Sequence, residues 1–518
     1  MFFFLKKEWT ASSTIARSRV KWAAPAASVS ANSTRRRAVW TAGLVMAGMF
    51  VSFLCGNGNE STPAGACGSY VPQIAEMPTF SDTVLEIGTR PDFGELLRGD
   101  RISFDGGVRR HEWILDDAGL FTPRWLEAAP AYPRFFWRSR SGAAQTLAMG
   151  SVAEGTLPEL LELLERSGRG VRVFGGACFD RRDGRERCWE GFPAECFFIP
   201  KAEIVHSGGR TRLAVNLGAG GFDLEDVAAW VAGLGECVSG VRPRVLTRWN
   251  QPNFSQWSAG VDSALAAFHE GGISKVVLAR RSCLELAEAV TPFALAGILA
   301  AAAPGCFHYC IEPEAKCGAF LGASPELLYR REGLKLRSEA VAGTRPRSLD
   351  ASEDERLESQ LLEFSKEQLE HRLVVDSLGE VFSRLCTEFS GDEKPGVLKL
   401  SRVQHLRTGF AGRLREGISD GEILAAFHPT PATCGCPTAA AMDFLKRNEP
   451  FDRGWYAGPV GCVAREEAEF AAAIRSMWCR GAQVDVFAGA GIVEGSDAER
   501  EWSELEDKIS GVLHLLSA

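Results

Sequence analysis

Short apolar runs rich in β-branched residues alternate along the chain with stretches whose apolar positions recur every three to four residues. The short runs predict strands at 171–174, 212–217, 275–279 and 484–488. After residue 70 the two kinds of segment mix without a regular βαβ alternation, a low-complexity linker or an internal repeat. The pattern therefore favours an α+β fold over a doubly wound parallel sheet.

Helical periodicity predicts three helices, over 291–303, from 352 to about 385 and from 498 to the C-terminus. The first has Thr291 at its N-cap, Pro292 in its first turn and Gly305 just past its end, which are the usual boundary residues of a helix.

A row of charged residues runs beside the apolar stripe of the last predicted helix. Glu501, Glu504 and Lys508 each lie one position before a member of that stripe, which consists of Trp502, Leu505, Ile509, Val512 and Leu516. Two carboxylates and an ammonium would then line the edge of a buried face. A solvated row with an i,i+4 Glu504–Lys508 pair is the other interpretation that this spacing allows.

The predicted helix over 352–385 repeats this arrangement. Glu367 and Glu370 are three positions apart, between Phe364 on one side and Leu373 on the other. Four carboxylates from two helices could meet around a hard cation such as Mg²⁺, which prefers oxygen ligands. Spacing alone leaves this open, because a chain with 66 acidic residues contains some such pairs in any case.

Charge and cysteine content restrict the function further. The formal net charge of −8 provides no basic excess to meet phosphates, which argues against a nucleic-acid partner. The 15 cysteines have neither the paired CxxC spacing nor the accompanying histidines of a zinc site. They are expected to be reduced thiols in a reducing compartment.

The first 70 residues differ in kind from the rest and are expected to be a targeting segment. Residues 1–37 carry their basic residues against a single acid, Glu8, amid many Ala, Ser and Thr, which is typical of a transit peptide. The uncharged stretch 38–55 reaches the lower limit for a membrane span, and the small residues at 64–66 resemble a cleavage site. The combination resembles the two-part targeting sequence of a photosynthetic eukaryote and predicts a plastid location after cleavage. A retained anchor, touching a membrane only through 38–55, is the alternative.

Nine short segments follow one another between residues 274 and 504: Ser274–Arg280, Gly322–Glu326, Val341–Arg345, Lys366–His371, His428–Ala432, Glu449–Arg453, Ala473–Arg475, Gly489–Val493 and Glu501–Glu504. Their sequences, among them KVVLAR, GASPE and VAGTR, and their order resemble the motifs of the chorismate-binding enzymes. That family includes isochorismate synthases, salicylate synthases and anthranilate synthase component I.

The upstream region resembles the isochorismate synthases more loosely, through Arg134–Trp137, Gly175–Gly176, Trp189, Phe192–Pro193 and Phe197–Pro200. The resemblance implies a single large α+β catalytic domain over 71–518, with extended β-sheets around a central cleft and helices outside. Residues 71–250 would form its N-terminal half and 251–518 its motif-bearing half.

The resemblance implies an isomerase of the isochorismate synthase type, which adds water at ring carbon 2 of chorismate and expels the hydroxyl from carbon 4. Lys275 matches the base that activates water, and Glu326 matches the acid that protonates the leaving hydroxyl. A free lysine is protonated near neutral pH, so the base role requires burial or nearby positive charge to favour the neutral amine. Glu326 must hold a proton, which a poorly solvated site or neighbouring carboxylates would favour.

Further matched positions imply a metal site and a substrate site. Glu370 and Glu504 match direct Mg²⁺ ligands, and Glu367 and Glu501 match acids that hold metal-bound waters. Arg475 and Lys508 match residues that bind substrate carboxylates, and Gly489–Gly491 is expected to be a turn that presents N–H groups to an anion. The full set of implied substrate-binding residues is Gly343, Thr344, Ala432, Tyr456, Arg475, Gly489, Gly491 and Lys508.

A few positions separate this chain from other branches of the family. Ala342 stands where aminodeoxychorismate synthases usually carry a nucleophilic lysine, and anthranilate synthases generally lack a lysine at position 275. Ala432 is typical of isochorismate synthases that stop before pyruvate elimination, whereas salicylate synthases tend to have threonine there. Leu369 is a departure, because relatives often have a basic or polar residue beside the metal ligand that Glu370 matches.

Two other functions stay open at this stage. A salicylate synthase would use the same acid, base and metal and continue to pyruvate loss. A non-catalytic relative tethered through 38–55 would only bind its ligand, although the joint presence of Lys275, Glu326, Glu370 and Glu504 argues against it. Because water is the expected nucleophile, no glutamine amidotransferase subunit is implied. The sequence leaves open whether the product feeds a quinone such as phylloquinone or menaquinone, or salicylate.

Overall fold

A computed structural model of the 518-residue chain describes residues 106–115, 121–180, 189–218, 225–234 and 244–517. All of these residues belong to one compact unit. The predicted targeting segment, with its apolar stretch 38–55, lies outside the described residues. Within them, no helix combines the length and the apolar character that crossing a membrane requires.

The described residues form strands and helices in mixed order. The strands are β1 Arg109–Leu115, β2 Arg134–Arg138, β3 Ala144–Gly155, β4 Arg172–Ala177, β5 Glu195–Ser207, β6 Arg210–Leu217, β7 Val245–Gln251, β8 Lys275–Leu286, β9 Phe307–Glu312, β10 Ala319–Ser324, β11 Leu327–Glu332, β12 Lys335–Pro346, β13 Cys386–Gly391, β14 Gly396–Lys399, β15 Val403–Leu414, β16 Gly435–Cys436, β17 Pro459–Ala464, β18 Glu467–Ala472, β19 Ser476–Arg480 and β20 Gln483–Ile492. The helices are η1 Pro123–Leu126, α2 Leu157–Glu165, α3 Glu225–Ala232, α4 Phe254–His269, α5 Pro292–Ala302, α6 Ala351–Glu363, α7 Ser365–Leu385, α8 Asp420–Phe427, α9 Thr438–Asn448 and α10 Ala498–Ser517.

Antiparallel pairing joins these strands into one continuous hydrogen-bonded sheet. In this sheet, neighbouring strands follow the order β7-β8-β20-β19-β10-β9-β2-β3-β5-β4-β17-β18-β11-β12-β15. Strand β1 extends β6 beside β5, while β13 and β14 pair with the outer side of β15. The absence of parallel pairs among the described strands agrees with the predicted α+β class rather than a doubly wound sheet.

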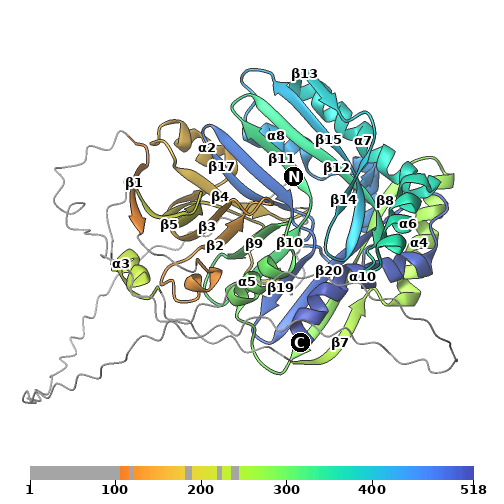
Figure 1. The fold of residues 1–518 in the computed structure, drawn as a ribbon, viewed down its shortest axis with the longest axis horizontal. Coiled ribbons are helices and arrows are strands. Elements are labelled where there is room, and N and C mark those ends of the chain that lie inside the picture. Colours follow the sequence, from red (N-terminus) through yellow and green to blue (C-terminus); the bar gives the residue numbers. More distant parts are fainter. Residues whose placement is uncertain (1–105, 116–120, 181–188, 219–224, 235–243, 518) are drawn as a thin grey trace, which may run out of the picture. The chain divides into compact units, whose positions relative to one another are not determined.

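The sheet folds back on itself, so that strands far apart in its order face one another. Helices α4 and α10 pack against β8 and β20, whereas α6 and α7 pack against β12 (Figure 1). One apolar core surrounds the β2–β10 and β8–β20 region, and a second lies between the β11–β12 region and helices α2, α7 and α8. The functional residues described below come from the elements between these two cores.

The predicted elements are present, with one correction in the long helix. The predicted strands correspond to β4, β6, β8 and β20, and the first and last predicted helices to α5 and α10. The helix expected to run continuously from 352 to 385 is instead two helices, because Phe364 adopts an extended backbone (ψ 127°) between α6 and α7. Phe364 ends α6 and begins α7, and no proline or glycine in the sequence marks this break.

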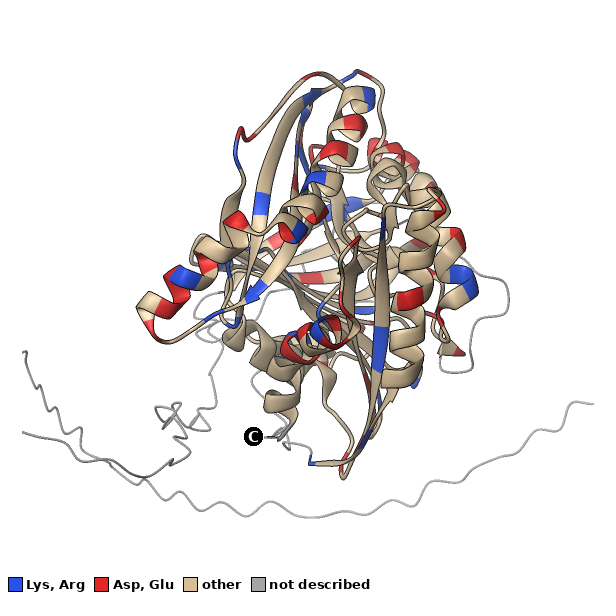
Figure 2. Cartoon of the chain, turned by 90° about the vertical axis from the view of Figure 1, so that its right-hand side faces the viewer, with Lys and Arg blue, Asp and Glu red and all other residues tan. Residues whose placement is uncertain are grey.

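The outer helices carry both acidic and basic residues, interspersed rather than gathered by sign (Figure 2). In α10 the predicted apolar stripe is confirmed, with Leu505, Ile509, Val512 and Leu516 buried. Glu501, in the adjoining row, is buried as well. The interpretation of this row as a wholly solvated one is therefore wrong at its first member.

Candidate active site

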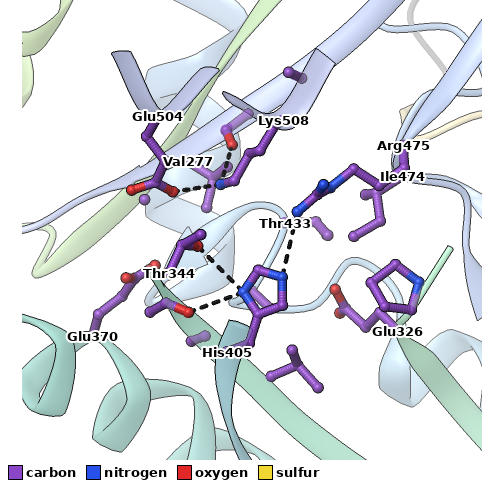
Figure 3. A pocket seen from close by; sticks show the side chains of 18 of the residues that line it. Val277, Glu326, Thr344, Glu370, His405, Thr433, Ile474, Arg475, Glu504 and Lys508 are labelled. Carbon is purple, nitrogen blue, oxygen red and sulfur yellow. Dashed lines mark hydrogen bonds and ion pairs between the residues drawn. The ribbon is translucent and has the colours of Figure 1, made fainter. Parts of the chain in front are cut away.

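A pocket opens between β8 and β20 on one side and β12 and β15 on the other, with α7 and α10 at its edge (Figure 3). Glu370 and Glu504 lie together at one side of it, and Glu326 lies at the opposite side, with His405 between them. Most of the residues singled out in the sequence line its wall: Glu326, Gly343, Thr344, Glu370, Ala432, Tyr456, Arg475, Gly489, Gly491, Glu504 and Lys508. Lys275, Glu367 and Glu501 lie behind these residues.

Lys275 is the first residue of β8 and is fully buried. Its ammonium lies 3.1 Å from Glu370 Oε1 and makes no hydrogen bond to a described residue. Burial removes the solvation of this amine, while the neighbouring carboxylate of Glu370 attracts its charged form.

Glu326 follows β10 and is buried, with 4% of its surface exposed. Burial, with a smaller contribution from the carboxylate of Glu339, raises its pKa to about 7 against the opposing effect of Lys275. The hydroxyl of Thr430 lies 3.4 Å from Glu326 Oε1 and donates to it. Glu326 can therefore hold a proton near neutral pH, as a general acid must.

Two glycines of β20 admit side chains from across the pocket. A Cβ on Gly491 would lie 2.0 Å from Glu370 Oε1, and a Cβ on Gly489 would lie 2.6 Å from the Tyr456 hydroxyl. The expectation that Gly489–Gly491 forms a turn is wrong, because these residues pair with β8 as part of the strand. The binding of an anion by their N–H groups stays a prediction. Glycine stands in this strand because neighbouring groups approach its backbone closely.

Gly343 marks an irregularity in β12. The register with β15 shifts between Ala342 and Thr344, and Gly343 has a left-handed backbone (φ 73°) that favours glycine. A Cβ there would lie 3.2 Å from the Cβ of Glu367. The bulge turns the carbonyl of Gly343 toward His405 Nδ1, 3.0 Å away.

Arg475 is held in place by a histidine that the sequence motifs did not reveal. His405, in β15, donates from Nδ1 to the Gly343 carbonyl, so its Nε2 accepts from Arg475 Nη2 at 3.3 Å. Burial, together with the positive charges of Arg475 and Lys508, lowers the pKa of His405 to about 3, so the ring is neutral. Arg475 itself has a left-handed backbone (φ 51°), a strained conformation of the kind that gathers at functional sites.

The row on α10 turns toward the pocket. Lys508 Nζ lies 2.6 Å from Glu504 Oε1 and donates to the Gly489 carbonyl at 2.8 Å. Burial opposes the ionisation of Glu504, but Lys508 and Lys366 outweigh it and hold the pKa of Glu504 below its usual range. The Glu504–Lys508 pair expected from the spacing is present, at the mouth of a pocket rather than on an open surface.

The remaining wall is apolar and small. Tyr456 is buried, and its ring stacks on Phe487 with centroids 5.4 Å apart. Ala432 lines the pocket beside Ala342 and packs on a small cluster that includes Val374. The two alanines leave space where larger side chains would fill the pocket.

Comparison with known proteins agrees with this arrangement. The family model described as "Chorismate binding enzyme" matches residues 122–517. The chain belongs to the chorismate-binding enzymes. It is 30% identical to the isochorismate synthase MenF of Escherichia coli over 76% of this chain and 90% of that one, and 34% identical to the chloroplastic isochorismate synthase 2 of Arabidopsis thaliana over 66% and 63%.

Solved structures of the family share the fold. The menaquinone-specific isochorismate synthase MenF of Escherichia coli superposes with a TM-score of 0.72 at 29% identity, covering 82% of this chain and 99% of that one. Anthranilate synthase component I of Streptococcus pneumoniae superposes with a TM-score of 0.59 at 21% identity, covering 81% and 96%, which shows the fold alone. The predicted family fold is thereby confirmed.

In this chorismate-binding enzyme, each of the four carboxylates expected at the metal is paired with a cation. Glu370 pairs with Lys275 at 3.1 Å, Glu504 with Lys508 at 2.6 Å and Glu367 with Arg345 at 2.6 Å, while Glu501 is bound by Lys366. No three metal-binding side chains of the described residues converge in this arrangement.

The donor set nevertheless suits a hard cation. All four groups offer oxygen, and Glu367 Oε2 is buried without a hydrogen-bond partner among the described residues. Lys366 also lies within electrostatic reach of Glu370 and Glu504. The sequence motifs assign Lys366 no role of its own, although it directly precedes Glu367.

Proposed function

We propose that this protein is an isochorismate synthase, an isomerase that moves the hydroxyl of chorismate from ring carbon 4 to ring carbon 2. The observation that carries the proposal is the environment of Glu326. Burial raises the pKa of its carboxyl to about 7, and it lines the same pocket as strand β8, which begins with Lys275. An acid that is protonated at neutral pH is what the departure of a ring hydroxyl requires. The similarity to isochorismate synthases over most of the chain supports the same reaction.

The reaction divides between the two sides of the pocket. Lys275, as the neutral amine, takes a proton from a water molecule, whose oxygen bonds to carbon 2. The ring double bonds shift, the bond from carbon 4 to its hydroxyl breaks, and Glu326 gives its proton to the departing oxygen, which leaves as water. The proton taken by Lys275 and the one given by Glu326 balance over the cycle.

Anion binding falls to the groups between the acid and the base. The guanidinium of Arg475, oriented by neutral His405, presents parallel donors to a substrate carboxylate, and Lys508 adds a positive charge beside it. Gly343, Thr344, Ala432, Tyr456, Gly489 and Gly491 shape the remaining wall. Glu370 and Glu504 would hold a Mg²⁺ ion, with Glu367 and Glu501 holding its waters, and the bound ion would supply positive charge to stabilise the substrate's ring carboxylate.

The test is to incubate the purified protein with chorismate and Mg²⁺ and to separate the products by chromatography. Isochorismate without salicylate or pyruvate is expected, because Ala432 leaves the loop without the hydroxyl that salicylate synthases tend to carry. Salicylate together with pyruvate would show that the reaction continues past isochorismate. A folded protein without turnover would contradict an enzymatic function.

The location of the protein is a separate part of the proposal. The basic, acid-poor composition of residues 1–37 and the similarity to chloroplastic isochorismate synthases of plants support import into a plastid. Fusing residues 1–70 to a fluorescent protein and following its location in an algal or plant cell tests this. Because water is the nucleophile, turnover is expected without an amidotransferase subunit.

A further inference from the structure

The catalytic acid of the proposed reaction lies in a gap of the sheet. Strand β10 ends at Ser324 and β11 begins at Leu327, so the peptide groups of Pro325 and Glu326 lie outside both strands. Buried backbone groups need hydrogen-bond partners, and the partners here determine where the Glu326 side chain points.

Side chains supply most of these partners. The N–H of Glu326 donates to Ser324 Oγ at 3.2 Å, and its carbonyl accepts from the N–H of Ala472 at 3.2 Å. The two flanking groups are bound from further away in the sequence. The Pro325 carbonyl accepts from Arg140 Nη1 at 3.0 Å, and the Leu327 N–H points to Glu339 Oε1 at 3.4 Å.

Arg140 and Glu339 also bind each other. The guanidinium of Arg140 meets both oxygens of Glu339, at 3.0 Å for the Nη2–Oε2 contact, and Arg407 Nε donates to Glu339 Oε2 at 2.6 Å. The Glu339 side chain is 1% exposed, and that of Arg140 is 24% exposed. The three residues come from the β2–β3 connection, β12 and β15, so the network ties three elements to the turn that carries Glu326.

We propose that Arg140 and Glu339 are positioning residues that grip the peptide groups before and after Glu326 and so fix the acid against the substrate. This inference rests on the proposed function, in which Glu326 is the proton donor. Neither residue lines the pocket, so both act through Glu326 rather than on the substrate. Moving a catalytic group by about 1 Å is enough to lower the rate roughly a hundredfold, so contacts that fix the position of Glu326 matter for catalysis.

The charged groups around Glu326 set its pKa, so changing them should change the pH dependence of activity. Glu326 feels Lys275 from β8, Glu339 from β12 and Lys508 from α10, with Tyr456 facing it from the loop before β17. Removing the charge of Glu339 is expected to lower the pKa of Glu326. Removing Arg140 leaves Glu339 less neutralised and is expected to raise that pKa.

The experiment measures kcat and KM for chorismate against pH in the full-length protein and in Glu339→Gln, Arg140→Met and Arg140→Lys. Activity falls as pH rises through the pKa of the acid, so Glu339→Gln should move this basic limb to lower pH and Arg140→Met should move it to higher pH. Both should lower kcat by about ten- to a hundredfold with KM nearly unchanged. Arg140→Lys keeps the charge, so it should restore the position of the limb and only part of kcat.

A matched control separates positioning from general stability. Arg331 on β11 and Asp420 on α8 form another buried ion pair, with 2.7 Å between Arg331 Nη2 and Asp420 Oδ2, and neither residue lines the pocket. Asp420→Asn should lower the thermal midpoint without moving the pH limb or kcat. If Glu339→Gln fails to fold, the two Arg140 variants, which alter a partly exposed side chain, still decide the question.

Two outcomes have different meanings. If the wild-type protein makes isochorismate and the Arg140 and Glu339 variants keep its kcat and its pH limb, the positioning role is wrong. If the wild-type protein makes none, the proposed function itself has failed.

Discussion

Glu326 is a buried glutamate in an environment unlike that of a surface glutamate. Because its folded pKa is raised to about 7, the wild-type rate is expected to fall as pH rises through that value. Glu326→Gln cannot donate the proton and should lower kcat by about a hundredfold or more while chorismate still binds. A pH profile of kcat/KM and a binding titration check both statements, and a variant with near wild-type kcat would contradict the acid role.

The same substitution should stabilise the protein at alkaline pH. A carboxyl with a raised folded pKa contributes its stability below the ordinary pKa, and this contribution is lost as pH rises through the folded value. Wild-type stability should therefore decline between about pH 4.5 and 7 from this group, and Glu326→Gln should not show that decline. Above pH 7 the variant is expected to be more stable by about 1–3 kcal/mol, measured by denaturant unfolding at several pH values.

Gly491 is a second position where adding a single carbon atom should change activity. Gly491→Ala places a Cβ 2.0 Å from Glu370 Oε1 and must displace that carboxylate. Turnover is expected to fall at least about tenfold, with weaker Mg²⁺ dependence, because a misplaced ligand loses its orientation. Gly379→Ala in α7 is the control: nothing lies within 4 Å of its Cβ, and removing a helical glycine should stabilise the fold by about 0.5–1 kcal/mol. Equal activity of both variants would contradict the prediction.

At the scale of elements, spacing identified α10 and α7 well and their neighbours less well. The i,i+3 carboxylates and the Glu504–Lys508 pair were readable because a helix repeats every 3.6 residues. The break at Phe364 was missed because no proline or glycine marks it, and the glycines of β20 were taken for a turn because glycine usually weakens a strand. Those glycines are required because the side chains of Tyr456 and Glu370 lie close to the β20 backbone in the folded protein, which the sequence pattern of one strand does not indicate.

An ion pair links helices α7 and α10 directly. Lys366 of α7 binds Glu501 of α10, and each of the other three carboxylates has its own cation. Chelating divalent ions is expected to abolish turnover while shifting the thermal midpoint by less than about 2 °C, since 1 kcal/mol shifts it by about 2–4 °C in a domain of roughly 150–250 residues and by less in a longer one. Circular dichroism melts with and without a chelator, and recovery of activity on adding Mg²⁺, check this. A large loss of stability would mean that the ion pairs do not hold the helices.

At the scale of the whole molecule, the N-terminal and C-terminal halves share one sheet. Strand β4 pairs with β17, and β2 pairs with β9, so a fragment 244–518 would leave two long strand edges uncovered. Such edges invite aggregation, and the fragment is expected to be insoluble or unfolded although it carries all nine motifs. Expression of the fragment beside the full chain, with solubility and circular dichroism as readouts, checks this; a soluble active fragment would contradict it.

The family and the α+β class could be predicted from the sequence, but the contacts between residues far apart in the chain could not. Arg140 and Glu339 are separated by 199 positions, and His405 stands alone in a strand without a spacing signal. Periodicity reports what lies along one element, and these residues act across elements. The contacts that orient Glu326 and Arg475 could therefore be found only in the folded molecule.

The strand order also sets the distance between the strand that carries the base and the strand that precedes the acid. Between β8, which begins with Lys275, and β10, which ends just before Glu326, lie only β20 and β19. Three steps of strand spacing set the two strands about 14 Å apart. Because strand spacing comes in fixed steps, point mutations cannot tune this separation gradually. New reactions on this frame must arise from the residues between the acid and the base.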